Sequence, residues 1–171
     1  SRGLALFDST TDQWQYFTKT NGLSHDFITA LRIIDNKVWI GTNKGLTYLD
    51  LKTNEFGAIN ELKDEFITSI TPNNNHLWIG TSKGLWRYYV TNQSLTHFTT
   101  EQGLTDNYVN TILEWNHGSV WVGTRDGISA YDPLKNIFQE VNGGPLTSGN
   151  ITVLSYDKDS QRIWAGKPEG L

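Results

Sequence analysis

The stretch Trp39-Ile40-Gly41-Thr42, followed after two further residues by Gly45-Leu46, decides the fold of this chain. The same order of tryptophan, apolar residue, glycine and threonine returns at Trp78 and at Trp121, and a degraded fourth copy begins at Trp164. The four tryptophans stand 39, 43 and 43 residues apart. A fixed period close to 40 residues indicates a repeat architecture.

Each repeat carries four short segments with the composition of β-strands. In the clearest copy they are 27–34, 37–42, 45–51 and a weaker 55–59, separated by turn-forming residues, and no segment shows a helical period. Four strands per unit at this period are typical of a β-propeller, so we expect an all-β chain of four-stranded antiparallel blades. The other expected strands are 3–8, 14–17, 66–71, 77–81, 84–90, 95–98, 108–115, 120–124, 127–131, 137–141, 150–156 and 163–166.

The repeat boundaries make residues 1–171 a single propeller segment with about four repeats. Its expected parts are outer strands of a split blade (1–20), three blades (21–60, 61–100 and 101–142) and inner strands of the split blade (143–171). Pairing of the two half-blades would close the ring and remove open sheet edges. The absence of Met and a start inside a repeat favour a piece of a larger propeller. A closed four-blade ring and an eight-blade ring of two chains stay open as alternatives.

We interpret the motif residues as packing residues. A tryptophan wedged between twisted blades buries a large apolar area, and the glycine two residues later leaves room where backbones crowd. The threonine can hydrogen-bond into the following turn, and the next glycine supplies a left-handed turn position. These structural residues are Trp39, Gly41, Thr42, Gly45, Trp78, Gly80, Thr81, Gly84, Trp121, Gly123, Thr124, Gly127, Trp164, Gly166 and Gly170.

Composition and charge exclude several classes of function. The formal net charge is −4 and charged residues are spread without blocks, so there is neither a nucleic-acid footprint nor a polybasic membrane patch. No apolar run approaches the roughly 20 residues of a membrane span. The absence of Cys excludes disulfides, thiolate metal sites and a Cys nucleophile. We expect no nucleic-acid partner and no membrane contact by this stretch.

No catalytic or metal-binding constellation is visible in the sequence. The histidines occupy four different positions of the repeat: His25, His76, His97 and His117. Repeat symmetry therefore does not bring them together, and we expect no catalytic residue, metal or cofactor. Asp8, Asp50 and Asp132 recur in phase after a strand, which favours turn caps over paired acid and base groups.

Several segments of the second repeat, taken together, resemble the two-component regulator propeller repeat. They are Asn21-Gly22-Leu23-Ser24, Ile28-Thr29-Ala30-Leu31, Val38-Trp39-Ile40-Gly41-Thr42 and Gly45-Leu46-Thr47-Tyr48-Leu49-Asp50, and the resemblance covers essentially the whole chain. It implies the extracytoplasmic or periplasmic sensor part of a hybrid histidine kinase, or of a diguanylate cyclase, in Gram-negative bacteria. It also implies more than four blades, oligosaccharide-like ligands and an output domain outside this stretch.

Three departures from that repeat mark the least regular blades. Lys167 stands where the motif has threonine, Val90 replaces the aspartate at the end of a third strand, and the link near Lys63 is short. The last blade and the blade with the 39-residue spacing are therefore expected to deviate most.

Propeller geometry indicates where a ligand would bind. The loops that enter the first strands and the loops that join second to third strands lie on one face, where repeat proteins carry variable residues. That face is polar, mixed in charge and bordered by aromatic residues, which suits a polyhydroxylated ligand. The alternative is that these are only solvated loop residues. The candidate ligand-binding residues are His25, Asp26, Asn43, Lys44, Lys83, Asp106, Asn107, Tyr108, Arg125 and Asp126.

The sequence thus predicts a non-catalytic sensing module of a bacterial signal-transduction protein. Its expected partners are a glycan or another small extracellular ligand, together with other propeller blades or a second chain. A protein–protein scaffold in the cell envelope is the alternative. A propeller lyase or hydrolase is a third reading, against which the scatter of the histidines argues.

Overall fold

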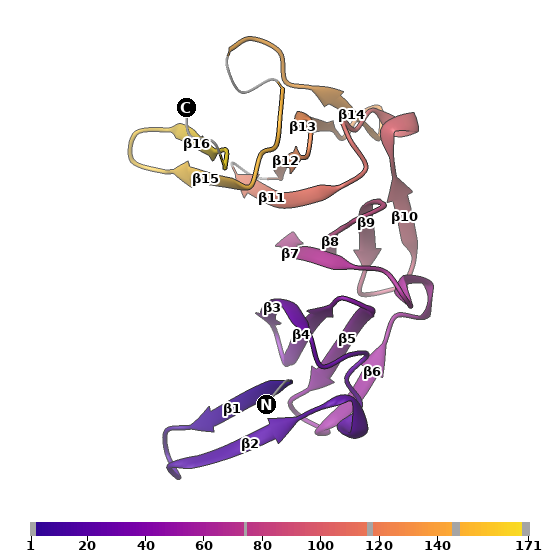
Figure 1. Cartoon of the computed structure of the whole chain (residues 1–171), viewed down its shortest axis with the longest axis vertical. Coiled ribbons are helices and arrows are strands. Elements are labelled where there is room, and N and C mark those ends of the chain that lie inside the picture. The colour runs from indigo at the N-terminus through magenta and orange to yellow at the C-terminus, as the bar shows by residue number, and fades with distance from the viewer. Residues whose placement is uncertain (1–2, 74, 116–117, 145–147, 169–171) are drawn as a thin grey trace. The chain divides into compact units, whose positions relative to one another are not determined.

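The chain is an all-β protein in the computed structural model, which describes residues 3–73, 75–115, 118–144 and 148–168 (Figure 1). It divides into two compact units, Ser1–Ile67 and Thr68–Leu171. The motif residue Gly170 and the histidine at position 117 lie outside the described residues. No described residue belongs to a helix with the length and apolarity that crossing a bilayer requires.

The first unit holds a hairpin and one complete blade. The hairpin is β1 (Leu4–Asp8) with β2 (Gln13–Phe17), and the blade is an antiparallel meander of β3 (Ile28–Ile34), β4 (Lys37–Thr42), β5 (Gly45–Asp50) and β6 (Glu55–Ala58). Short 3-10 turns, η1 (Lys19–Asn21) and η2 (Asn60–Leu62), follow β2 and β6. Leu23, Val38, Ile40 and Leu49 form the core of this unit.

The second unit holds two complete blades and a second hairpin. Its elements are β7 (Ile67–Asn73, which begins at the last residue of the first unit), β8 (His76–Thr81), β9 (Gly84–Tyr89), β10 (Leu95–Phe98), η3 (Thr100–Gln102), β11 (Val109–Trp115), β12 (Ser119–Thr124), β13 (Gly127–Asp132), β14 (Ile137–Glu140), β15 (Val153–Asp157) and β16 (Arg162–Gly166). Each blade again pairs its strands in sequence order. Trp78, Leu85, Phe98, Val122 and Phe138 lie in one apolar cluster of this unit.

The predicted all-β class and the four-stranded antiparallel blade are confirmed. The expected strand bounds agree with the structure within two residues, except for the strand expected at 150–156. That strand begins at Val153, because the amide of Ile151 donates to the carbonyl oxygen of Thr124 (2.9 Å) instead of joining its own sheet.

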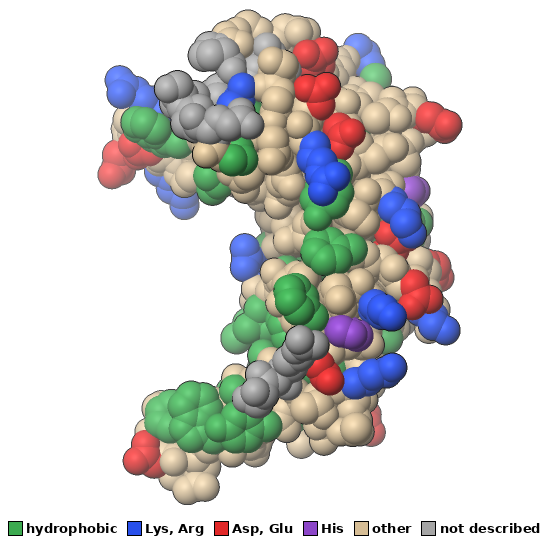
Figure 2. Space-filling model, in the orientation of Figure 1, with side chains coloured by type: hydrophobic (Ala, Val, Ile, Leu, Met, Phe, Trp, Pro, Cys, Tyr) green, Lys and Arg blue, Asp and Glu red, His purple; other side chains and the backbone are tan. Residues whose placement is uncertain are grey.

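The structure does not show a ring closed through a split blade, and the division of one blade between the two ends stays a prediction. β1–β2 and β15–β16 form separate two-stranded sheets, and no pairing among the described residues joins them. Without two further strands beside them, these hairpins leave aromatic side chains in water. Trp14 and Tyr16 of β2 are exposed, and Figure 2 shows hydrophobic side chains gathered over the β1–β2 hairpin.

The motif tryptophans differ in burial. Trp39 and Trp78 are 1% exposed, as a wedge between sheets requires. Trp121 is partly buried beside Trp115, with ring centroids 6.0 Å apart. Trp164 is 61% exposed, so the expectation that it packs like the others is wrong. Its strand β16 pairs only with β15 and has no outer strand to cover it.

The glycines two residues after the tryptophans lie against the blade that follows. A Cβ added to Gly41 would lie 2.7 Å from Cγ2 of Ile67, and one added to Gly123 would lie 2.7 Å from Cγ2 of Ile151. Real Cβ atoms do not approach another carbon so closely. Only glycine therefore leaves enough space at this position for the residue that packs against it from the following repeat. The predicted crowding of backbones at this position is confirmed.

Threonine fastens the turn between the second and third strands in all three complete blades. Thr42 donates to the carbonyl oxygen of Gly45 (2.9 Å) and accepts from the amide of Lys44 (3.0 Å). Thr81 and Thr124 repeat both bonds within their own turns. The glycine that ends the turn has φ between 97° and 135° in each blade, a conformation that side chains with Cβ disfavour.

Candidate functional site at the loop edge

Within the first unit, backbone hydrogen bonds hold the two predicted classes of loop together. The amide of Asn43, in the β4–β5 turn, donates to the carbonyl oxygen of Phe27 (3.2 Å), which precedes β3. Two residues later the amide of Gly45 donates to the carbonyl oxygen of Glu65 (2.7 Å), which precedes β7. The β4–β5 turn is therefore fixed on both sides by loops that lead into first strands.

The second unit repeats this arrangement around the β12–β13 turn. The amide of Arg125 donates to the carbonyl oxygen of Tyr108 (3.2 Å), and the amide of Gly127 donates to that of Gly149 (2.9 Å). The carboxylate of Asp126 accepts from the amide of Gly149 (3.1 Å). Each unit thus has an edge, called here the loop edge, at which both classes of loop meet. A ligand-binding role for their residues stays a prediction.

Besides Asp126, four more of the candidate residues hold the backbone of this edge. His25 Nδ1 accepts from the amide of Phe27 (3.0 Å), and Asp106 accepts from the amide of Tyr108 (2.7 Å). Asp26 and Asn107 take equivalent positions: Asp26 accepts from the amide of Lys19 in η1 (2.6 Å) and Asn107 from the amide of Thr100 in η3 (2.9 Å). Their side-chain acceptor atoms position loops, which leaves fewer lone pairs for a ligand.

The other candidates present groups toward the surface of the loop edge. The guanidinium carbon of Arg125 lies 3.6 Å from the ring centroid of Tyr108, a cation–π contact. The Oδ1 atom of Asn43 is buried and has no hydrogen-bond partner among the described residues. The backbone oxygen of Lys83 lies 3.1 Å from His97 Nε2, and the His97 ring stacks on Trp86 with centroids 4.0 Å apart.

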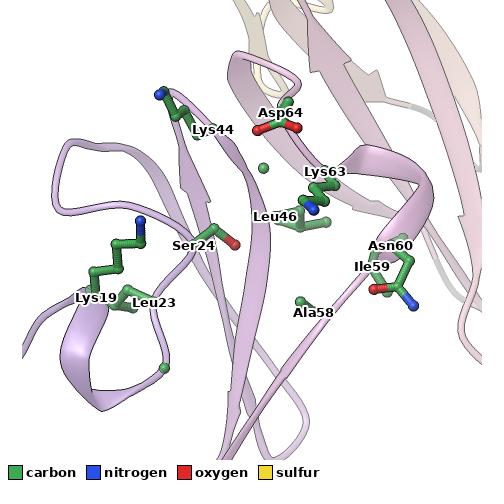
Figure 3. A pocket seen from close by; sticks show the side chains of 12 residues that line it. Lys19, Leu23, Ser24, Lys44, Leu46, Ala58, Ile59, Asn60, Lys63 and Asp64 are labelled. Carbon is green, nitrogen blue, oxygen red and sulfur yellow. The ribbon is translucent and has the colours of Figure 1, made fainter.

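A hollow of about 440 Å³ lies at the loop edge of the first unit (Figure 3). Three lysines from three different segments surround it: Lys19, Lys44 and Lys63. In the view of Figure 3, Ser24 and Leu46 lie between them. Among the described residues none of the three ammonium groups makes a hydrogen bond or an ion pair. The hollow is lined by Lys19, Gly22, Leu23, Ser24, Lys44, Gly45, Leu46, Ala58, Ile59, Asn60, Lys63 and Asp64.

The electrostatics of this hollow favour a negatively charged or strongly polar ligand. Three ammonium groups face a single carboxylate, that of Asp64, and the amide of Asn60 adds donors and an acceptor. The amide of Ser24 donates to Thr47 Oγ1 (2.9 Å), and the two hydroxyl oxygens lie 2.5 Å apart, which fixes the floor of the hollow. A concave site with a few fixed polar groups is the usual form of a small-molecule site.

Sequence reasoning found only Lys44 among the charged residues of this hollow. Lys19 was missed because it belongs to the turn after the preceding hairpin. Lys63 belongs to the short link, which the sequence marks as an irregularity, and Asp64 belongs to the loop that enters the next first strand. The short link was the sequence feature that could have pointed to this hollow. Asn60 of η2 and the charged residues Lys63 and Asp64 that follow it line the hollow together with Lys44 and Gly45 of the β4–β5 turn.

The in-phase aspartates act as turn caps, as the sequence predicted. Asp8 accepts from the amide of Thr10 (2.8 Å), and Asp50 accepts from the amide of Lys52 (2.9 Å). The pKa of Asp8 is lowered mainly by the Thr10 side-chain hydrogen bond, and that of Asp50 mainly by the Lys52 amide. Asp132 accepts from the amide of Leu134 (3.0 Å). Within the described ranges, no three His, Asp or Glu side chains cluster closely enough to hold a metal ion.

No protein-family model matches this sequence, and no curated protein matches it. Solved structures do. The extracellular domain of the hybrid two component system BT4673 from B. thetaiotaomicron aligns with a TM-score of 0.80 and 24% identity, over 96% of this chain and 23% of that chain. The extracellular domain of BT3049, from the same organism and the same kind of system, aligns with a TM-score of 0.76 and 22% identity, over 97% and 23%.

An ancestral GH74 enzyme also aligns, with a TM-score of 0.68 and 16% identity, over 89% of this chain and 23% of that chain. The chain therefore spans about a quarter of the length of each of these structures. At these identities the likeness shows a shared fold of repeated blades. A signalling domain and an enzyme both carry it, so function has to be argued from the site.

Proposed function

We propose that this chain is a sensing segment of an extracytoplasmic signalling protein, which binds an acidic oligosaccharide at its loop edge without transforming it. The single observation that carries the proposal is the hollow with three lysines around it and Ser24 and Asn60 in its wall. Lysine ammonium groups attract carboxylates or sulfates, and hydroxyl and amide groups bind sugar hydroxyls. The resemblance to the extracellular domains of two-component systems supports the signalling context and the extracytoplasmic location.

The absence of turnover is proposed on chemical grounds. Hydrolysis of a glycosidic bond ordinarily needs two carboxyl groups on either side of the scissile bond. In the described lining of the hollow the only carboxyl group is that of Asp64. A lyase needs a general base within reach of an acidic C–H, and the aspartates at the ends of third strands are occupied as turn caps.

The test is calorimetric titration of the chain with trigalacturonate and with neutral maltotriose. We expect trigalacturonate to bind more tightly, because only it carries carboxylates. Lys44→Ala and Lys63→Ala should each weaken its binding by about fivefold, as expected for a partly solvated charge contact. The matched control is Lys52→Ala, in the β5–β6 turn outside the hollow, which should leave binding unchanged. Equal affinity for both sugars, loss of trigalacturonate during incubation, or equal effects of all three variants would contradict the proposal.

A scaffold function is the second candidate, and one observation favours it. Phe7, Trp14 and Tyr16 form an exposed aromatic row on the β1–β2 hairpin, with ring centroids 4.8 Å and 6.3 Å apart. Exposed apolar rows of this kind pack against further blades or another chain. Sedimentation of the chain over a wide concentration range tests it. Concentration-dependent association that Trp14→Ser abolishes would support it, and a monomer at all concentrations would reject it.

A further inference from the structure

A second hollow, of about 310 Å³, lies in the second unit at the end of the strands opposite to the loop edge. Its described lining comes from β7, β8, β9 and β13, together with Gly118 before β12 and Pro133 after β13. None of the candidate residues from the sequence belongs to it. The hollow is lined by Asn73, His76, Trp78, Arg87, Tyr89, Gly118, Tyr131 and Pro133.

Arg87 is held in one position in the wall of this hollow. Its guanidinium carbon lies 5.5 Å from the ring centroids of Trp78 and Tyr131 and 5.2 Å from that of Tyr89. Nη1 donates to the hydroxyl of Tyr131, and Nη2 donates to Oδ1 of Asn136 (2.8 Å). Arginine stays protonated in proteins, so this fixed group is a permanent positive charge. In the described part of the chain no carboxylate pairs with it.

Three nitrogen atoms around the hollow are buried and have no hydrogen-bond partner among the described residues. They are Nε of Arg87, Nε1 of Trp78 and Nε2 of His76. The indole and guanidinium nitrogens can only donate, and the buried indole belongs to a side chain that is 1% exposed. Buried donors without acceptors are costly, and native proteins rarely leave them so.

The chemistry of the lining restricts what that acceptor can be. The described lining has a fixed cation and N–H donors and no acidic side chain, so it selects for a negative oxygen. The remaining walls are the rings of Tyr89, Tyr131 and Pro133, which favour a planar apolar body next to that oxygen. A neutral sugar would leave the guanidinium unpaired, and an inorganic oxyanion would leave the aromatic walls unused.

We propose that this hollow binds a small organic carboxylate with a planar apolar body, at a second site distinct from the loop edge. The carboxylate pairs with the guanidinium group of Arg87, and the body of the ligand packs on the rings of Tyr89 and Tyr131. This site is independent of the proposed oligosaccharide site. Either can fail without the other.

The experiment uses benzoate as a probe of the chain, with the indole N–H resonances followed by ¹⁵N-resolved NMR. Benzamide is the matched neutral control, because it has the same ring without the charge, and sulfate tests whether an inorganic oxyanion suffices. We expect benzoate to shift the Trp78 resonance saturably, while benzamide and sulfate shift it little. Arg87→Lys, which keeps a charge and loses Nε–H, should weaken benzoate binding about tenfold.

Two further variants make the result decisive. Arg125→Lys is the matched control, because Arg125 also stacks on a tyrosine in the same unit but at the loop edge, and it should bind benzoate like the parent chain. Pro133→Trp fills the hollow from an exposed turn without removing a buried group, and it should abolish the shift even if Arg87→Lys folds poorly. No saturable shift with benzoate, an equal shift with benzamide or sulfate, or undiminished binding by Pro133→Trp would overturn the proposal.

Discussion

The guanidinium group of Arg125 lies over the ring of Tyr108, with 3.6 Å between the guanidinium carbon and the ring centroid. The backbones of the same two residues are joined, because the amide of Arg125 donates to the carbonyl oxygen of Tyr108. One residue precedes a first strand and the other begins the turn after a second strand. This pair therefore links the two classes of loop at the loop edge through backbone and side chain together.

The first prediction concerns this pair. Because both side chains are partly solvated, their coupling should be about 0.5–1 kcal/mol, as for cation–π contacts near the surface. A double-mutant cycle with Arg125→Gln and Tyr108→Leu, measured by chemical denaturation, gives that coupling. A coupling indistinguishable from zero would mean that the backbone bond alone links the two loops.

The second prediction concerns the threonine that fastens the β8–β9 turn. Thr81 is fully buried, donates to Gly84 and accepts from Lys83 (both 3.0 Å), so Thr81→Val leaves a buried carbonyl and a backbone amide without partners. We expect the free energy of unfolding to fall by about 1–3 kcal/mol. Thr81→Ser keeps the hydroxyl and serves as the control, with a smaller loss. A loss in Thr81→Val no larger than the loss in Thr81→Ser would show that the hydroxyl contributes no more to stability than the methyl group.

The third prediction concerns the packing of a first strand on the preceding blade. A Cβ on Gly80 would lie 2.5 Å from Oγ of Ser69 and 2.7 Å from Cγ1 of Val109, so Gly80→Ala should destabilise the chain by about 1–3 kcal/mol through overpacking. Gly166→Ala is the matched control at the same position of the last repeat. There the new Cβ would meet only Val153 of its own hairpin, and the loss in thermal denaturation should be smaller. If Gly80→Ala leaves the thermal stability of the chain unchanged, the explanation by overpacking is wrong.

The fourth prediction concerns pH. Burial, with a smaller contribution from the charge of Arg87, lowers the pKa of His76 below its ordinary 6.5. The folded chain then binds a proton at this site less readily than the unfolded chain. Stability from this site is present above pH 6.5 and is lost as the pH falls toward the folded pKa. We expect the melting temperature of His76→Gln to fall less than that of the parent chain between pH 7.5 and 5.5.

The control for the pH experiment is His97→Gln, at a partly buried histidine on β10. It should reproduce the pH dependence of the parent chain. If His76→Gln and the parent chain lose the same stability on acidification, the buried imidazole does not carry the effect.

The repeat made most of the fold predictable. The tryptophan period gave the number of complete sheets, and Thr42, Thr81 and Thr124 make the turn bonds expected of them because those bonds are local and depend only on neighbouring residues. The crowding at Gly41 was predictable because the same close approach to the following repeat recurs at each regular copy of the motif.

The repeat could not predict features that depend on neighbouring residues which differ from one repeat to the next. Trp164 carries the motif, yet it is exposed because burial requires strands that its hairpin lacks. Lys19 stands in η1 where the equivalent position of η3 is Thr100, and Lys63 lies in the shortened link, so no periodic signal marks either lysine. Arg87 occupies a third-strand position where the other repeats have Tyr48 and Ala130, so no periodic signal marks it.

The contact between each motif glycine and the blade after it has an evolutionary consequence. Gly41 faces Ile67, Gly80 faces Val109, and Gly123 faces Ile151. The space left by each glycine is therefore filled by a branched side chain roughly thirty residues further along the chain. Substitutions at the two positions are accepted or rejected as a pair. Among homologues these pairs should therefore covary, and a duplicated blade should remain compatible with its neighbours only when the glycine and its partner are inherited together.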